Sequence, residues 1–387
     1  MLRSGLVGRA ATYHEVVASH IARRIPQMNP PDTDVTDGSP TAPVQEISID
    51  TLAPGAVREV PIALPEGGWA IEQVVEKAGS GGPDSSLIWQ FDAHEENEGT
   101  LIVVGPAGQT PSSRTIQIRF VEDDQGGDRT SSPREDDPIA VDPDASDEAQ
   151  DAYEIRTPTA SYFYHKTGGG FSSLVDRDGN DWISYRPGNG PAGEYRGIPN
   201  MVFRSDGGRN NHFHPGHKKH KASTARLVHS GPLKVTIESS VDETRWRVRW
   251  EIFPNLARLT VLDIDHDDPR FWFLYEGTPG GSFELKDQCL RSNGVDSPLS
   301  EKWEDRTDAI AWVAFRVPEQ NRSLLLRLET EVDVPVSYYP MAPMTVFGFG
   351  RKLGSVENFL STAPTQITVR FLETSDPEQI EALAASE

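Results

Sequence analysis

Short runs of alternating apolar and polar residues, each closed by glycine, proline or aspartate, follow one another along most of this chain. In Thr244–Trp250, for example, Trp246, Val248 and Trp250 fall on one side. A two-residue period is typical of a β-strand with one buried face, and long alternating strands indicate antiparallel sheets with one wet face. We therefore expect an all-β protein.

The runs form two groups, which predict two domains. The first group is compatible with a small immunoglobulin-like β-sandwich, and the second, aromatic-rich group with one large antiparallel β-sandwich of the supersandwich type. Between them lies a stretch rich in aspartate and glutamate, which predicts a disordered linker because it has little apolar surface to bury. The expected parts are an N-terminal helix and linker (1–43), the Ig-like sandwich (44–122), the acidic disordered linker (123–151), the large sandwich (152–374) and a C-terminal helix or tail (375–387).

Composition excludes some classes of function. The 387 residues carry a formal net charge of −22, which disfavours a general nucleic-acid binder, because phosphate neutralisation needs a basic face. The mean hydropathy is −0.50 and no apolar run is long enough to span a bilayer as a helix. Cys289 is the only cysteine, so no disulfide forms within the chain. The acidity is compatible with ordinary solubility, with a saline habitat or with a GC-rich genome.

Histidines are densest in Asn210–Lys221, with sequence NNHFHPGHKKHK. His212 and His214 would project to the same side of an extended segment, and His217 could join them after a Pro-Gly turn. The cluster could bind a divalent metal such as zinc or manganese. It could instead form, with Lys218, a cationic patch for a carboxylate-bearing substrate, with a histidine for proton transfer. A mobile basic loop without a site is the third interpretation.

Tyrosine, arginine and asparagine lie between glycine and proline in Gly193–Asn200, a composition typical of loop-borne sites. Arg196 could clamp a carboxylate through two parallel hydrogen bonds, Tyr195 could serve as an acid or base, and Asn200 could bind substrate. A simple turn with an ion pair between Arg196 and Glu194 is the alternative.

An aromatic run ends in a Gly-rich turn at Arg270–Gly281. Glu276 at its end is a natural position for an acid or base, with Tyr275 beside it. Trp272 lies on the other face from Tyr275 and could contact a sugar ring, although core packing is an equal alternative. Glu251 is the second carboxylate of interest, as a substrate-binding group or as a structural partner of arginine.

Four stretches resemble a known architecture: FSSLVDRDGNDWI (171–183), RWEIFP (249–254), FWFLYEGTPGG (271–281) and MTVFGFGR (344–351). The first resembles the opening of the large β-sandwich domains related to galactose mutarotase, which recur in polysaccharide lyases and in several glycoside hydrolases. The other three are similar to later strands of an uncharacterised environmental-bacterial family of the same architecture. The resemblance covers residues 152–374. It implies that a sugar lies across a concave sheet, and it transfers no catalytic role to any residue.

The favoured hypothesis is an extracellular or periplasmic carbohydrate-active protein, most simply a lyase that acts on a uronic-acid polysaccharide. No secretory signal is recognisable, so a cytoplasmic location stays open. For a lyase, Arg196 or Lys218 would neutralise the carboxylate, His212 or His214 would act as base, and Tyr195 or Tyr275 as acid. A glycoside hydrolase would instead pair Glu251 with Glu276. A carbohydrate-binding or surface structural protein without catalysis is the third hypothesis.

Overall fold

We describe the protein from a computed structural model. The structure describes residues 42–385 except for a series of short segments, and the expected N-terminal helix lies outside the described residues. In the described part, no helix has the length and apolarity needed to cross a membrane. The segments outside the description are 53–55, 78–84, 96, 106–111, 124–128, 132–133, 185–196, 205–209, 214–222, 242–245, 265–269, 308–309, 356, 358 and 362–364.

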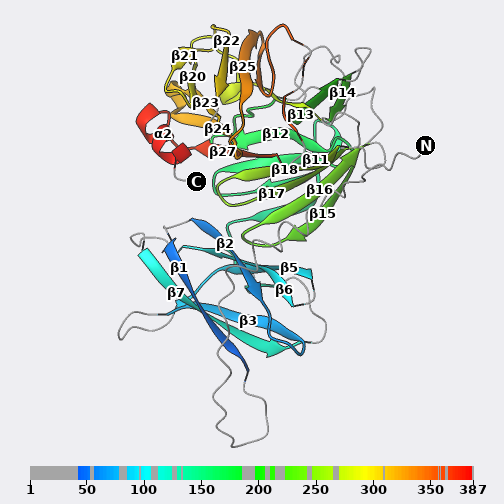
Figure 1. Cartoon of the computed structure of the whole chain (residues 1–387), viewed down its shortest axis with the longest axis vertical. Helices are drawn as coiled ribbons and strands as arrows, with labels where there is room; N and C mark the ends of the chain where they lie inside the picture. The colour runs from blue at the N-terminus through cyan, green and yellow to red at the C-terminus, as the bar shows by residue number, and fades with distance from the viewer. Residues whose placement is uncertain are drawn as a thin grey trace, which may run out of the picture. The chain divides into compact units, whose positions relative to one another are not determined.

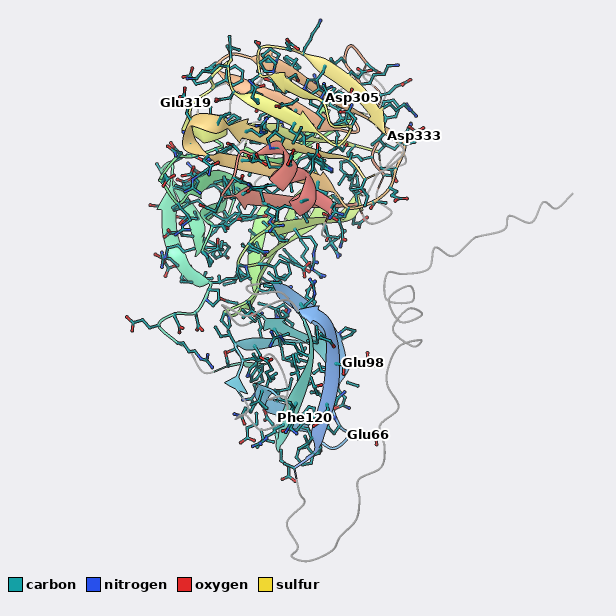
Figure 2. The ribbon with its side chains drawn as sticks, turned by 90° about the vertical axis from the view of Figure 1, so that its left-hand side faces the viewer. Glu66, Glu98, Phe120, Asp305, Glu319 and Asp333 are labelled. Atoms are coloured by element: carbon teal, nitrogen blue, oxygen red, sulfur yellow. The ribbon has the colours of Figure 1, made fainter. Side chains whose placement is uncertain are left out.

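The chain divides into two compact units, with the boundary between Ser131 and Ser132. The first unit has two four-stranded sheets within its described residues, as expected for a small β-sandwich. Its core includes Trp89, Phe91 and Phe120, the last of which is labelled in Figure 2. One sheet has the order β1 (Val44–Leu52), β7 (Ser112–Glu122), β3 (Trp69–Glu76), β4 (Ser85–Ser86), and the other β2 (Val57–Ala63), β6 (Glu98–Val104), β5 (Trp89–Glu95), β8 (Arg129–Thr130).

The expected disordered linker over 123–151 is wrong over much of its length. Thr130 pairs with Gln90 inside the first unit, and β9 (Ala140–Asp147) pairs with β10 (Gln150–Arg156) in the second. Most side chains of β9 are at least partly exposed, because β9 is the edge strand of its sheet. Backbone pairing with a neighbour is enough to order an edge strand that has almost no apolar residues of its own.

The second unit is a large antiparallel β-sandwich (Figure 1). One of its sheets has ten strands in the described part of the chain, and we call it the ten-stranded sheet. Its order is β22 (Trp303–Thr307), β25 (Val334–Met341), β26 (Met344–Phe349), β19 (Trp272–Glu276), β13 (Gly197–Arg204), β12 (Gly170–Asp176), β11 (Ala160–His165), β10, β9. Among the described strands, the tenth, β14 (Asn210–Phe213), pairs with β13 only.

The other sheet of this unit, the nine-stranded sheet, lies against it. Two short 3-10 helices, η1 (Pro279–Gly281) and η2 (Pro318–Gln320), join strands of the unit. The described strand order is β15 (Thr224–Ser230), β16 (Val235–Val241), β17 (Trp246–Ile252), β18 (Ala257–Ile264), β27 (Gln366–Leu372), β24 (Arg322–Leu328), β23 (Trp312–Val317), β20 (Gln288–Arg291), β21 (Asp296–Pro298).

Aromatic side chains from both sheets fill the core of the sandwich. Phe171 of the ten-stranded sheet and Trp250 of the nine-stranded sheet pack with ring centroids 4.6 Å apart. Tyr164 contacts the same phenylalanine edge-on and donates to or accepts from the Ser239 hydroxyl at 2.7 Å. Fully buried aromatic residues contribute the largest share of apolar area per residue. The alternation in β17 therefore predicts correctly that Val248 and Trp250 face the core.

The expected C-terminal helix is confirmed as α2 (Pro377–Ala385). Its buried residues Ile380 and Ala384 pack on Leu290, Leu325 and Leu372, on the side of the nine-stranded sheet away from the main core. Figure 1 shows α2 beside β24 and β27.

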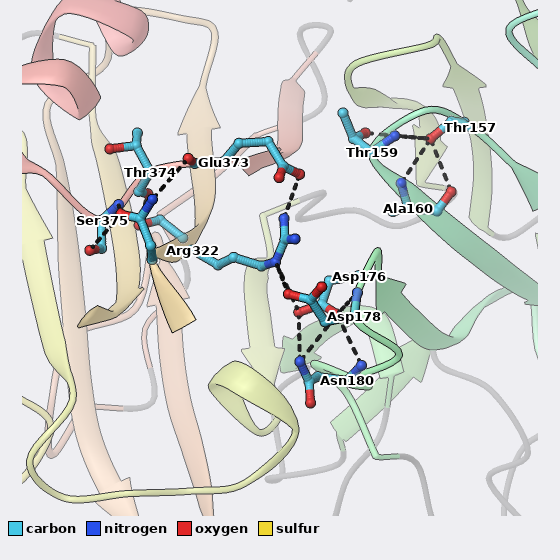
Figure 3. Close-up of polar contacts among 12 residues, drawn as sticks. Thr157, Thr159, Ala160, Asp176, Asp178, Asn180, Arg322, Glu373, Thr374 and Ser375 are labelled. Carbon is cyan, nitrogen blue, oxygen red and sulfur yellow. Dashed lines mark hydrogen bonds and ion pairs between the residues drawn. The ribbon is translucent and has the colours of Figure 1, made fainter. Parts of the chain in front are cut away.

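A polar cluster joins the two sheets at the turn after β12 (Figure 3). Asp176 accepts hydrogen bonds from the Trp182 indole at 2.9 Å and from the backbone nitrogens of Asp178 and Asn180 at 2.9 and 3.0 Å. Arg322 of β24 donates to Asp178 at 2.8 Å and forms an ion pair of 2.5 Å with Glu373. The carboxylate of Asp176 thus stabilises the turn that follows it, and Arg322 connects that turn to the nine-stranded sheet.

Candidate functional site

The candidate site lies on the outer face of the ten-stranded sheet, by which we mean the face turned away from the main core. In β19, Phe273 and Tyr275 belong to that core. Successive residues of a strand point to opposite faces, so Trp272, Leu274 and Glu276 face outward. Strand alternation thus divides these side chains between the two faces, and those on the outer face are also buried.

Asn200 and Glu276 form a buried polar pair on this face. The amide Nδ2 of Asn200 donates to Oε2 of Glu276 at 2.6 Å, and the residues are 0% and 3% exposed. A carboxylate only accepts hydrogen bonds, so it fixes the orientation of the amide. The Oδ1 of Asn200 is buried and accepts no hydrogen bond from the described part of the chain. Such an oxygen costs about 1–3 kcal/mol unless a donor reaches it.

Apolar side chains surround the pair. Val202, Trp272 and Leu274 form a small cluster separate from the main core. The register places Asn200 opposite Leu274 and Val202 opposite Trp272. The indole of Trp272 donates to the backbone oxygen of Glu357 at 2.7 Å, which fixes the plane of its ring. The pair is therefore buried beside apolar side chains, and hydrogen bonds in a buried site are stronger than in water.

A cation lies at the same face. The guanidinium of Arg351, which follows β26, is 4.9 Å from the ring centroid of Tyr339 and 5.8 Å from that of Trp272. Arg351 is partly exposed. We call Asn200, Glu276, Trp272, Leu274 and Arg351 the outer-face site.

A second polar group lies on the outer face, toward β9. Tyr164 belongs to the core, so its neighbour His165 points outward, and its side chain is 1% exposed. Its Nε2 lies 2.9 Å from the backbone oxygen of Asp147, while the hydroxyl of Ser173 donates to the Asp147 carboxylate at 2.8 Å. Burial lowers the pKa of His165 below its usual value, although both contacts with Asp147 act in the opposite direction. A neutral imidazole is therefore the favoured form at neutral pH.

Two residues predicted for the site lie elsewhere. Tyr275 faces the core, where its hydroxyl donates to the backbone oxygen of Trp182 at 2.6 Å, and burial raises its pKa well above the usual value. The expectation that it protonates a leaving group is wrong. Glu251 lies in the nine-stranded sheet and binds Lys234 and Arg258 at 3.3 and 2.9 Å. The two-carboxylate hydrolase pair of Glu251 and Glu276 is therefore also wrong, because these residues belong to different sheets.

Most of the predicted cationic and histidine residues cannot be placed. The backbone of His212 lies in β14, opposite Val202 of β13, and so on the strand next to Asn200. In the described part of the chain, no three histidine, cysteine or acidic side chains are arranged to hold a metal ion. Tyr195, Arg196, His214, His217 and Lys218 lie outside the described residues, so their roles stay predictions.

Comparison with known proteins gives structural likenesses and no sequence match. No protein-family model matches the sequence, and no curated protein matches it. Among solved structures, the chain is similar to a putative aldose 1-epimerase from Escherichia coli K12, with 10% identity over 57% of this chain and 98% of the other, and a TM-score of 0.34.

Proposed function

We propose that the protein is carbohydrate-active and that the outer-face site binds a uronic-acid polysaccharide and cleaves it by β-elimination. The buried pair of Asn200 and Glu276 is the observation that carries this proposal. The Oδ1 of Asn200 needs a donor, and a sugar hydroxyl is one. The carboxylate of Glu276 lies beside it, and Trp272 and Leu274 supply apolar neighbours on the same face.

Elimination at a uronate breaks the C5–H and C4–O bonds and forms a double bond between C4 and C5. A base takes the C5 proton, the electron pair of that bond moves into the double bond, and the leaving oxygen receives a proton. Glu276, oriented by Asn200, is the described residue best placed to move a proton. His212 and His214 stay alternative bases and Tyr195 the predicted acid.

The test is to incubate the protein with polygalacturonate, alginate and hyaluronan and to follow the ultraviolet absorbance of the unsaturated product. The control for each polymer is the same polymer after its carboxylates have been reduced to alcohols. We expect absorbance to rise with at least one native polymer and with none of the reduced ones.

Other outcomes would replace this proposal. New reducing ends without absorbance would show a glycoside hydrolase, and tight binding without any product would show a binding protein. If the protein neither binds nor cleaves any of the three polymers, the proposed function is wrong. A chelator that abolishes activity would assign the histidine cluster to metal binding rather than to proton transfer.

A further inference from the structure

The backbone of Arg351, within the outer-face site, is held by its neighbours. Gly350 has a φ of +69°, and a Cβ at that position would lie 2.6 Å from Cγ of Leu360, so the chain turns there as only glycine can. The chain then returns to the start of β19, where Phe271 and Leu360 exchange two backbone hydrogen bonds of 2.9 and 3.1 Å. The backbone is therefore held on both sides of Arg351.

The aliphatic part of the Arg351 side chain lies across the sheet next to Gly348. A Cβ on Gly348 would lie 3.0 Å from Cβ and 3.1 Å from Cδ of Arg351, and 2.7 Å from Cδ2 of Leu274. Gly348 is the register partner of Leu274, which precedes Glu276 by two residues on the same face. Two residues along a strand span about 6.6 Å. The arginine stem thus crosses the outer face about one sugar ring away from the acidic group.

Two aromatic rings hold the head of this side chain. The guanidinium carbon is 4.9 Å from the Tyr339 centroid and 5.8 Å from the Trp272 centroid. Both rings are fixed in turn: the Tyr339 hydroxyl donates to the Met341 sulfur at 3.7 Å, and the Trp272 indole to a backbone oxygen. Contact with ring faces attracts a cation and so positions the guanidinium. The planar fork of a guanidinium matches the two oxygens of a carboxylate.

We propose that Arg351 binds the carboxylate of an acidic sugar and thereby selects uronic-acid chains over neutral ones. This inference rests on the proposed function, because it assumes that a polysaccharide lies across the outer-face site. It assigns the carboxylate-binding role to a residue other than Arg196 and Lys218. A sulfate ester offers a similar set of oxygens, so the test must separate the two anions.

The experiment measures binding of polygalacturonate, alginate and hyaluronan to the wild type and to Arg351→Ala, Arg351→Lys and Arg306→Ala. Each polymer is also used in its carboxyl-reduced form, and carrageenan supplies sulfate without carboxylate. Arg306→Ala is the matched control, because this substitution removes the same charge from an exposed ion pair with Asp333. Thermal unfolding of each variant checks that the fold is intact.

We expect Arg351→Ala to weaken binding of the native uronate polymer by about tenfold or more, the cost of one charge-assisted contact. Arg351→Lys should retain part of the affinity, since the charge stays and the fork is lost. Arg306→Ala should bind like the wild type. The reduced polymer should bind the wild type and Arg351→Ala equally, because no carboxylate is left for the arginine to contact.

Three results would overturn the inference. If the wild type binds a uronate polymer and Arg351→Ala binds it equally well, Arg351 is not the carboxylate-binding residue and the proposed function stands. If binding follows sulfate rather than carboxylate, the assigned anion is wrong. If the wild type binds no uronate polymer at all, the proposed function and this inference fail together.

Discussion

The two sheets of the large sandwich both carry polar side chains on the faces turned away from the core, and they do so in different ways. On the nine-stranded sheet, charges neutralise one another: Glu251 lies between Lys234 and Arg258, and Glu238 binds Arg249 at 2.6 Å. On the ten-stranded sheet, Glu276 is paired with a neutral amide that keeps one oxygen without a described donor.

Under the proposed function, the nine-stranded sheet contributes stability and the ten-stranded sheet carries the site. Ion pairing offsets part of the hydration that Glu251 and Lys234 lose in the fold, where their side chains are 14% and 5% exposed. On the ten-stranded sheet, the buried Oδ1 of Asn200 has no donor in the described part of the chain, and the proposed function assigns a ligand hydroxyl to it. The comparison predicts that changes on one sheet affect activity and changes on the other affect stability.

The largest effect is expected at Glu276. Replacement by glutamine keeps the size of the side chain and removes the proton acceptor, so the rate of product formation should fall by about 100-fold or more. Initial rates from ultraviolet absorbance measure this, and thermal unfolding confirms that the variant folds. A variant that keeps most of the wild-type rate would remove Glu276 from the mechanism.

The matched change on the other sheet is Glu251→Gln. It leaves Lys234 and Arg258 without their shared carboxylate, which should lower the free energy of unfolding by about 3 kcal/mol and leave the rate per folded molecule unchanged. Chemical denaturation measures the first quantity. A loss of activity without a loss of stability would contradict the assignment of this sheet to structure.

The same variant should also change acid stability. Burial alone would raise the pKa of Glu251, but Arg258 and Lys234 outweigh it and hold the pKa below its usual value. Its contribution is therefore present above pH 4.5 and is lost as the pH falls through the lowered value. Below pH 4.5 the wild type should lose its advantage over Glu251→Gln, and a constant difference would contradict the pairing.

A smaller pH effect is expected on the outer face. The pKa of His165 is lowered in the fold, so stability should fall as the pH drops below 6.5, with a slope of up to about 1.4 kcal/mol per pH unit. In His165→Gln, stability should depend less on pH below 6.5, and the rest of the pH profile of stability should be unchanged. Denaturation curves on either side of pH 6.5 measure it, and parallel profiles would show that His165 does not titrate with folding.

The smallest effect is expected for Arg306→Ala. Arg306 and Asp333 form a bidentate pair, but their side chains are 59% and 58% exposed, and Figure 2 labels Asp333 on the large unit. Exposed ion pairs contribute little because water and salt screen them. We expect no measurable change in melting temperature. A clear loss would mean that exposure is a poor guide to which charges matter in this domain.

Sequence reasoning predicts the all-β architecture and separates the faces of β19, because strand alternation is a local property. It cannot say which face becomes the core, and so it assigns both Tyr275 and Glu276 to catalysis although neighbours in a strand point to opposite sides. Arg351 and His165 carry no local signal, because the residues that they contact are distant in sequence. The acidic stretch misleads for the same reason, because β9 is ordered by β10 rather than by its own composition.

The tie made by Arg322 has a consequence for the lifetime of the fold. It joins residues 144 positions apart, and contacts of such separation form only after much of the chain has been brought together. Interactions completed after the folding transition state leave the rate of folding nearly unchanged and slow the rate of unfolding. Because Arg322 connects the turn after β12 to β24 and Glu373, we expect its loss to speed unfolding more than it slows folding.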